Sequence, residues 1–411
     1  MKVVHIIGGP LDKGAAKGAF RLHQGLCQNG VDSSVVANYP ISDTHTRIRS
    51  YDEFWIRRIF RSIIHRFNNL FLIVYRHRES GIFTTSFVGH AVHRHPSVRR
   101  ADIVHLHWVS GIVGLRAMSR LKVPVVWTLR DMWPMTGGCH YSFGCYNYEK
   151  RCGRCPSLGS KRRFDVSRVI QKLKSRIVRN RSVTPVAVSS WIQQAARRSG
   201  VFKDSEIHVV HNSVDTELYS PIDQTEARNI VGLPLDKKIV LTGAQNIDDL
   251  YKGFDLFIAA VRLLRGERIQ IVLVGGSQCS WPASTRFEVR SFGLVRDETL
   301  LQHIYSAADV FVLPSRMDAF PKMPVESMAC GTPVVCFGSV GTADVIDHKL
   351  NGYVSNSFDP ADLAKGIDWA ISLDPRSYRE ASQRCVSTVQ GRLDNKTIAA
   401  QYKHIYTKAL A

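Results

Sequence analysis

The chain has 411 residues, more than one hydrophobic core usually supports, so we expect about two domains. Hydrophobic residues make up 44% and charged residues 22%, a balance that argues against extensive disorder. With 55 Lys and Arg against 35 Asp and Glu, the formal net charge is +20. This charge predicts a polyanionic neighbour, which is a nucleic acid, an anionic membrane surface or a phosphorylated substrate.

The chain opens with a short apolar run at residues 3–7, followed by Gly8, Gly9 and a stretch of small residues, in the order strand, loop, helix. The run is too short for the hydrophobic core of a signal peptide. No apolar segment approaches the roughly 20 residues that cross a bilayer. We therefore expect a cytoplasmic protein that is peripheral on the inner face of the cytoplasmic membrane.

Two sets of apolar runs, separated by segments long enough for helices, predict two parallel α/β sheets. The first set comprises residues 3–7, 35–37, 103–106, 125–129 and 186–188, and the second comprises 239–242, 271–274, 310–313 and 334–337. A turn and a proline at residues 211–221 separate the sets. We therefore place an N-terminal domain at residues 1–214 and a C-terminal domain at residues 215–394.

Residues 55–78 carry apolar side chains every three or four positions and basic side chains between them. No acidic residue lies between Phe54 and Arg78. This pattern favours an amphipathic helix on an anionic membrane surface. The alternative is an internal helix that packs on the sheet and exposes its basic face to solvent.

The segment 310–338 combines a buried strand, a loop with Asp318, a helix that contains Glu326 near its start, Gly331 after the helix, and another strand. In open α/β sheets, ligands bind beyond the carboxyl ends of the strands, and helix N-termini attract phosphate. Carboxylates at that edge suit sugar hydroxyls. The segment therefore predicts a sugar-nucleotide binding loop, although each carboxylate alone also fits an ordinary solvated loop.

Over nearly its whole length the chain resembles the retaining glycosyltransferases of family four, which have two Rossmann-like domains facing one another across a cleft, the GT-B architecture. Members carry two acidic residues separated by seven others, a spacing that Asp318 and Glu326 share, with Asp in place of the usual first Glu. The resemblance implies that Glu326 binds the ribose diol and that donor-sugar hydroxyls bind Asp318 and the backbone of Phe320, Pro321, Lys322 and Met323. It also implies a C-terminal helix, at about residues 395–411, that packs back on the first domain.

The segment that begins at Leu241 resembles the diphosphate site of the family. Gly243 ends a strand, and Lys252 and Gly253 follow, so that Lys252 would neutralise the leaving group. Ala244 stands where the family commonly has an arginine. A further segment is similar to the one in which the family's backbone recognises the base, and here it contains Gly293, Leu294 and Val295.

In the first half of the chain, His105 and His107, with Gly111 after them, match a histidine pair of the family. His107 is our acceptor-side candidate, because a neutral imidazole can hydrogen-bond the donor sugar or the incoming hydroxyl. The loop at Gly14 resembles the family's glycine-rich first loop, with Lys13 where a glycine is common. The resemblance implies that this loop closes over phosphate or acceptor.

Residues 127–158 are similar to bacterial members that build cell-surface polysaccharides, in exopolysaccharide and O-antigen (lipopolysaccharide) biosynthesis. Such members usually carry a histidine where this chain has Arg130, just before Asp131. Four cysteines in the same segment suit a tetrahedral structural zinc: Cys139, Cys145, Cys152 and Cys155. Reduced thiols in an ordered loop, or a disulfide formed on isolation, are the alternatives, and redox catalysis is a distant third.

The resemblance implies a retaining enzyme that moves a sugar from a nucleoside-diphosphate sugar to a lipid-linked (polyprenyl diphosphate) or saccharide acceptor. His107, Lys252, Asp318 and Glu326 are the predicted catalytic residues, and no metal or other cofactor is required for catalysis. A nucleotide-sugar epimerase and a degenerate, non-catalytic sugar-nucleotide binder are the alternatives. We expect no nucleic-acid partner, because the chain carries no recognised nucleic-acid module.

Overall fold

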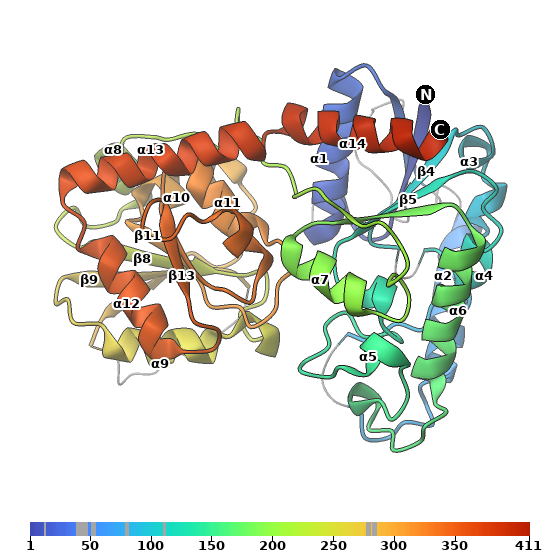
Figure 1. Ribbon diagram of the computed structural model, residues 1–411. Coiled ribbons are helices and arrows are strands. Elements are labelled where there is room, and N and C mark those ends of the chain that lie inside the picture. The colour runs from blue at the N-terminus through green and yellow to red at the C-terminus, as the bar shows by residue number, and fades with distance from the viewer. Residues whose placement is uncertain are drawn as a thin grey trace. The chain divides into compact units, whose positions relative to one another are not determined.

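The computed structural model describes residues 1–11, 14–37, 48–50, 55–78, 82–109, 112–276, 281 and 286–411. It divides into two compact units, Met1–His211 with Ile398–Ala411, and Asn212–Thr397 (Figure 1). Each unit contains one parallel sheet with helices packed against it. No helix in these described ranges is long and apolar enough to span a bilayer.

The sheet of the first unit has the strand order β3-β2-β1-β4-β5-β6-β7. Its strands are β1 (Lys2–Ile7), β2 (Asp32–Ala37), β3 (Ile48–Ser50), β4 (Ile103–Leu106), β5 (Val125–Leu129), β6 (Val183–Ala187) and β7 (His208–Val209). The helices are α1 (Gly14–Gln28), α2 (Trp55–Leu70), α3 (Pro96–Arg99), α4 (Leu115–Met118), α5 (Asn147–Lys150), α6 (Val166–Asn180) and α7 (Ser190–Arg198). All the strands pair in parallel, and residues 103–106 and 125–129 form strands with the predicted bounds.

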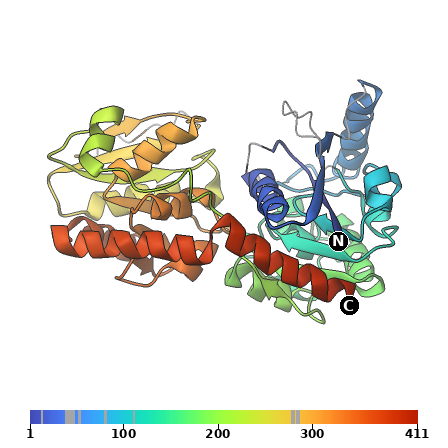
Figure 2. The ribbon, with the colours of Figure 1, turned by 90° about the horizontal axis from the view of Figure 1, so that it is seen from above.

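The C-terminal helix α14 (Asn395–Leu410) belongs largely to the first unit, and Figure 2 shows its C-terminal end near the N-terminus of the chain. Its apolar face includes Ile398, Tyr402 and Tyr406, which pack against Val3 of β1 and Ile103 of β4. Side chains that touch three or more elements in this way bury much of the apolar area that holds a domain together. The helix therefore completes the core under the first sheet.

The sheet of the second unit has the order β10-β9-β8-β11-β12-β13, which is the strand order 3-2-1-4-5-6 of a Rossmann fold. Its strands are β8 (Lys238–Gly243), β9 (Ile269–Val274), β10 (Glu288–Ser291), β11 (Val310–Leu313), β12 (Val334–Phe337) and β13 (Gly352–Ser355). Its helices are α8 (Gln224–Val231), α9 (Phe254–Leu263), α10 (Glu298–Ala307), α11 (Lys322–Ala329), α12 (Pro360–Ile371) and α13 (Pro375–Arg392). Helices α9 and α12 cover one face, and α8, α10, α11 and α13 cover the other (Figure 1).

Helix α2 is shorter than the predicted helix at residues 55–78, because it ends at Leu70 and a turn follows. Asn68 explains this end. Its side chain is buried, donates to the carbonyl of Val88 at 2.8 Å and accepts from the Val88 N–H. The asparagine therefore attaches the end of the helix to residues 84–89, and the chain turns there.

Candidate functional site

In the second unit, β8 and β11 are neighbours, and the strand order reverses between them. The strands after β8 extend the sheet on one side, and the strands after β11 extend it on the other. A reversal of this kind opens a crevice beyond the carboxyl ends of the two strands, where ligands of open α/β sheets bind. Gly243 ends β8, and the loop after β11 carries Asp318. The structure thus brings to one sheet edge the residues that the sequence predicted for the donor.

Lys252 and Asp318 form an ion pair at this edge, with 2.7 Å between Nζ and Oδ2. Their side chains are 19% and 10% exposed, so the pair is partly withdrawn from water. Gly253 makes the approach possible: it has a φ of +66°, and a Cβ there would lie 2.0 Å from the carbonyl oxygen of Pro314. The backbone turn after β8 therefore touches the end of β11, and any side chain at position 253 would separate the two.

Glu326 lies in α11 and is 3% exposed. The hydroxyl of Tyr305 donates to its Oε2 at 3.3 Å, and burial beside this carboxylate raises the pKa of Tyr305 well above its usual value. Helix α11 begins directly after Pro321, and the first N–H groups of any helix have no partner within it. The Glu326 carboxylate thus lies within two turns of a helix N-terminus, a combination suited to hydroxyls and phosphate.

The remaining donor-side predictions lie along the same edge. Gly243 allows close packing, since a Cβ there would lie 2.6 Å from Cε of Met323 and 2.4 Å from the carbonyl oxygen of Val274. The carbonyl of Gly293 accepts from the N–H of Gly275, which places residues 293–295 beside the end of β9. The carbonyl of Phe320 accepts from Asn212 Nδ2 at 3.0 Å.

Sequence reasoning missed Ser315, which follows β11 in the same loop. It is 1% exposed, and its Oγ has no hydrogen-bond partner in the described structure. A buried hydroxyl without a partner costs free energy, and this one lies in the loop between β11 and Asp318. The sequence signal was its position directly after the proline that stops the strand.

In the first unit the order reverses between β1 and β4, and the loops after both strands meet. The N–H of Gly8 donates to the carbonyl of Trp108 at 2.7 Å, and Gly9 packs on the Trp108 ring. Gly14 begins α1 with a φ of +46°. Lys13 and Gly111 lie outside the described residues.

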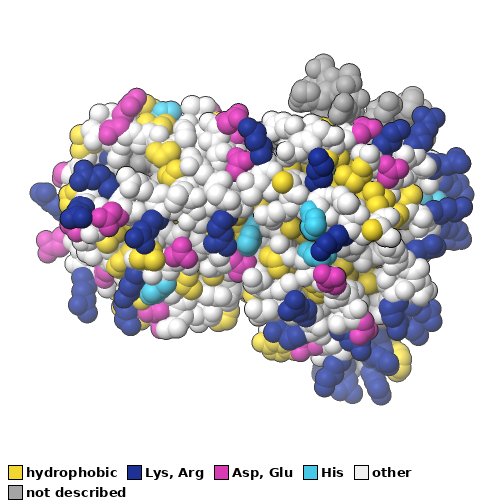
Figure 3. All heavy atoms as spheres, turned by 45° about the horizontal axis from the view of Figure 1, so that its top comes forward, with side chains coloured by type: hydrophobic (Ala, Val, Ile, Leu, Met, Phe, Trp, Pro, Cys, Tyr) yellow, Lys and Arg dark blue, Asp and Glu magenta, His cyan; other side chains and the backbone are white. Residues whose placement is uncertain are grey.

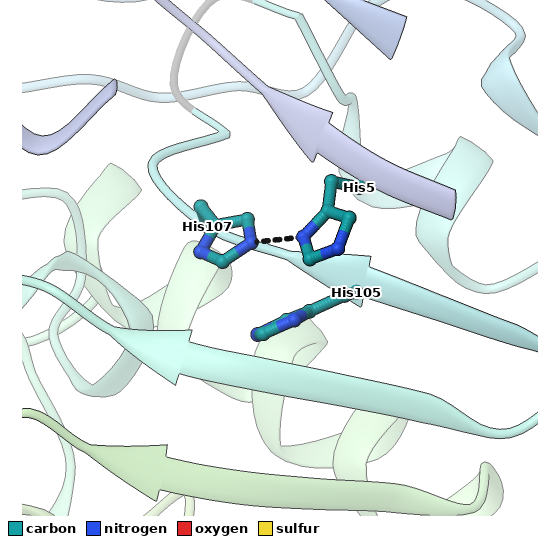
Figure 4. A group of neighbouring side chains, drawn as sticks. All are labelled: His5, His105 and His107. Atoms are coloured by element: carbon teal, nitrogen blue, oxygen red, sulfur yellow. Dashed lines mark hydrogen bonds between the residues drawn. The ribbon is translucent and has the colours of Figure 1, made fainter. Parts of the chain in front are cut away.

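His107 follows β4 and belongs to a stack of buried imidazoles with His5 of β1 and His105 of β4 (Figure 4). Arg130 donates to Nδ1 of His107 at 3.3 Å, and a guanidinium can only donate. Nε2 of His107 therefore carries the proton and donates to Nδ1 of His5 at 2.8 Å. Both ring nitrogens of His107 are thus occupied by protein groups, so a substrate contact requires one of them to be exchanged.

His105 links the stack to the C-terminal helix. Its Nδ1 lies 2.7 Å from the Tyr406 hydroxyl, and its Nε2 lies 2.7 Å from Oγ1 of Thr128, which in turn lies 2.8 Å from the Tyr402 hydroxyl. Burial lowers the pKa of His5, His105 and His107 well below the usual value, and the three are neutral at neutral pH. In the described part of the chain, these are the only three potential ligand side chains with ligand atoms all within 4.8 Å of one another. The adjacent Arg130 cation opposes a metal ion there, so we interpret the stack as a hydrogen-bonded network.

Arg130, which replaces the histidine of similar sequences, is 9% exposed, and burial lowers its pKa to about 10. The next residue, Asp131, accepts from Nε1 of Trp108 at 2.9 Å and bonds Nδ1 of His140 at 2.6 Å. These side chains line a small pocket together with His107. The pocket therefore combines a cation, a carboxylate and aromatic edges next to the predicted acceptor residue.

The four cysteines lie in the loop region between β5 and α6. All four are among the described residues, and no three of their sulfur atoms lie within 4.8 Å of one another. Cys139 and Cys155 are hydrogen-bonded to one another, and this bond lowers the pKa of Cys139 to about 7. The structure thus shows a thiol pair, and the zinc site stays a prediction.

Buried polar side chains of α6 hold this loop region, a support that sequence reasoning missed. Asp165, the N-cap of the helix, accepts from the Cys155 N–H at 3.0 Å, and Gln171 accepts from the Cys152 N–H at 2.6 Å. Lys174 is fully buried and donates to the carbonyls of Trp133 and Thr136. Gln171 and Lys174 lie on the buried face of α6. Polar residues within the apolar stripe of a helix were the sequence signal from which this support could have been predicted.

Solved structures share the fold over nearly the whole chain. Sucrose-phosphate synthase from Thermosynechococcus elongatus is 19% identical with a TM-score of 0.68 and covers 99% of this chain and 98% of its own. HepE from Anabaena, solved in complex with UDP and glucose, is 16% identical with a TM-score of 0.68 and covers 99% and 100%. The predicted fold class, α/β with two Rossmann-like domains, is confirmed, and it is that of the GT-B glycosyltransferases.

The chain belongs to Glycosyltransferase Family 4, whose pattern matches residues 13–218, half of its length. Residues 236–372 match a second family, described as glycosyl transferases group 1. Among curated proteins, the D-inositol 3-phosphate glycosyltransferase of Mycolicibacterium smegmatis is 29% identical over 293 residues, which is 68% of this chain and 62% of that protein. The protein of the same name from Xylanimonas cellulosilytica is 28% identical over 68% of this chain and 66% of its own. The matched stretch thus spans less than two thirds of these relatives.

Proposed function

We propose that the protein is a retaining glycosyltransferase that transfers a sugar from a nucleoside-diphosphate sugar to a hydroxyl group. The observation that carries the proposal is the Lys252–Asp318 pair on the sheet edge that also carries the buried Glu326. This edge provides a cation for a diphosphate, carboxylates for hydroxyls and helix N–H groups for phosphate oxygens. Membership of Glycosyltransferase Family 4 and the UDP and glucose bound to the similar HepE fold support this proposal.

In the proposed division of labour, Glu326 binds the ribose diol and Asp318 binds hydroxyls of the transferred sugar. Lys252 leaves Asp318 to bind the diphosphate as the bond to the sugar loosens, and it then stabilises the departing negative charge. Residues 293–295 bind the base through their backbone. The proton of the acceptor hydroxyl goes to the leaving diphosphate, so the scheme needs no protein nucleophile and no metal.

For the acceptor we propose a lipid-linked or saccharide hydroxyl in cell-surface polysaccharide biosynthesis, at an anionic membrane surface. The net charge of +20 supports the membrane part of this proposal. The similar curated proteins are named for D-inositol 3-phosphate, so a phosphorylated polyol is the second candidate acceptor. Arg130 in the pocket beside His107 favours an acceptor with a negative charge in both cases.

A panel of nucleotide sugars, assayed by isothermal titration and then by release of nucleotide with and without acceptors, tests the proposal. We expect one donor to bind, Glu326→Ala to weaken it, and nucleotide release to need a polyprenyl-diphosphate saccharide. Release with D-inositol 3-phosphate instead would select the second acceptor. Conversion of the donor sugar without any acceptor would identify an epimerase, and binding without turnover a non-catalytic binder. If no nucleotide sugar binds, the central proposal is wrong.

A further inference from the structure

The first unit exposes a run of large apolar side chains on and directly after α2. The five most exposed are Ile63 at 53%, Phe67 at 46%, Leu70 at 56%, Ile73 at 67% and Val74 at 76%, which we call the apolar patch. Exposed basic side chains flank it at Arg66, Arg76 and Arg78. Soluble surfaces rarely leave so many neighbouring apolar side chains in water unless another surface covers them.

A pocket of about 580 Å³ opens beside α4 and α6. Its apolar lining includes Phe87, Leu115, Leu173 and Ile177, all buried or half-buried. Three exposed arginines complete it: Arg116 of α4, Arg176 of α6 and Arg181 directly after α6. An apolar floor under three guanidinium groups suits an amphiphile with an anionic head.

The pocket and the apolar patch are connected. The ring of Phe87, in the pocket, packs on the ring of Phe71 at the end of α2, with 4.8 Å between centroids. Asn68 of α2 bonds the backbone of Val88, and the N–H of Leu115 donates to the carbonyl of Ser86. Helix α4 contacts α6, and Phe87 joins their pocket to the end of α2. Figure 3 shows many Lys and Arg side chains along the right edge of the first unit.

The chain segments that build the pocket contain no acidic residue. Residues 103–130, which include α4, have no Asp or Glu, and neither do residues 166–203, which include α6. Arg181 also donates to the carbonyl of Ser119, which holds one guanidinium at the rim. The charge of this edge is therefore positive along both segments, and it matches an anionic surface.

We propose that the pocket binds the phosphate group of an anionic phospholipid while the apolar patch enters the acyl layer beside it. Guanidinium forks from Arg116 and Arg176 bind the phosphate oxygens, and Phe87 and Leu173 contact the first carbons of the chains. This inference gives a lipid site to the membrane association in the proposed function, and it rests on that part of the proposal.

The test compares two double variants that each remove two positive charges. Arg116→Gln with Arg176→Gln changes the pocket, whereas Lys172→Gln with Arg179→Gln removes two exposed charges of α6 outside the pocket. Binding to vesicles of equal parts phosphatidylglycerol and phosphatidylcholine is measured by flotation at low salt, and thermal unfolding checks that each variant folds. We expect the pocket variant to bind about tenfold more weakly than its charge-matched control, since bonds from guanidinium to phosphate are lost.

Three results would overturn the inference. Equal weakening of both variants would mean that the basic edge attracts the membrane only diffusely. If the wild-type protein does not bind the vesicles at all, the pocket and the apolar patch are not a membrane-binding surface. Inorganic phosphate that displaces the protein from vesicles in proportion to its occupancy of the pocket would make this a site for free phosphate. Donor binding is titrated on the same variants without vesicles and should be unchanged. A wild-type protein that binds vesicles but no nucleotide sugar would contradict the proposed function and leave the lipid site standing.

Discussion

Nζ of Lys252 lies 2.7 Å from Oδ2 of Asp318, so two side chains predicted to bind different parts of the donor bind each other. A donor must therefore compete with an existing ion pair. Because both side chains are largely buried, removal of one leaves a charge with little solvation. Mutation of this pair is therefore the most direct test of the proposed donor site.

Lys252→Met should lower kcat on the order of 100-fold, because one cation no longer stabilises the leaving diphosphate. Steady-state kinetics with saturating donor measures this change. Lys237→Met is the control, since Lys237 pairs with the exposed Glu288 away from the site and should keep wild-type kcat. An unchanged kcat in Lys252→Met would remove Lys252 from the mechanism.

Glu326→Gln should weaken binding of the whole nucleotide series by a common factor of about tenfold, because a charged acceptor of ribose hydroxyls becomes neutral. Isothermal titration of the nucleoside, its diphosphate and the nucleotide sugar gives the factor for each. Inorganic diphosphate should bind the variant as it binds the wild type. If diphosphate alone weakens, Glu326 acts on phosphate geometry and the ribose assignment is wrong.

The buried histidine stack should make the protein less stable in acid. Burial lowers the pKa of His5, His105 and His107, so below about pH 6.5 the unfolded chain binds protons that the folded chain does not. The free energy of unfolding then decreases as the pH is lowered, by about 1.4 kcal/mol per pH unit for each histidine. Denaturant unfolding from pH 7 downward should show a shallower slope in His5→Gln. His404→Gln, at an exposed position of α14, controls for the loss of an imidazole, and equal slopes in both variants would contradict the prediction.

Lys174 should extend the same kind of dependence above neutrality. Burial lowers its pKa from 10.5 to about 7, so between these values the unfolded chain binds the extra proton and stability rises with pH. Lys174→Met should abolish this rise, which amounts to about 1.4 kcal/mol per pH unit. Lys172→Met, an exposed change on the same helix, should retain it. A rise that persists in Lys174→Met would show that the amine stays protonated at its bonds to Trp133 and Thr136.

Cys139 should react with iodoacetamide at neutral pH faster than Cys145. Both thiols are half-buried, but the hydrogen bond from Cys155 lowers the pKa of Cys139 to about 7, while burial raises the pKa of Cys145. Mass spectrometry of a time course gives both rates. If all four cysteines are protected and a chelator abolishes this protection, zinc binds at the cluster. Equal rates for Cys139 and Cys145 without zinc would contradict the lowered pKa.

The amino-acid sequence predicted the two sheets and the residues at the donor edge. Residues 103–106, 125–129, 310–313 and 334–337 form strands with their predicted bounds, because each run is buried on both faces and is too short for a helix. The four edge strands β3, β7, β10 and β13 were missed, because each has only two to four residues and none is a continuous apolar run. Strand β10, for example, carries Glu288 and Arg290.

Which of the predicted residues contact one another depends on the order of the strands in the two sheets. His5 and His107 are 102 positions apart, and Lys252 and Asp318 are 66 apart, yet both pairs meet because β1 lies beside β4 and β8 beside β11. Strand order sets these neighbours, and a periodic pattern along the chain contains no information about it. Lys174 likewise supports the cysteine loops only because it is buried. From the residue type alone a lysine is expected at the surface. Residue types and spacings therefore predicted the groups at the site, whereas sheet order and burial decided their partners and their charges.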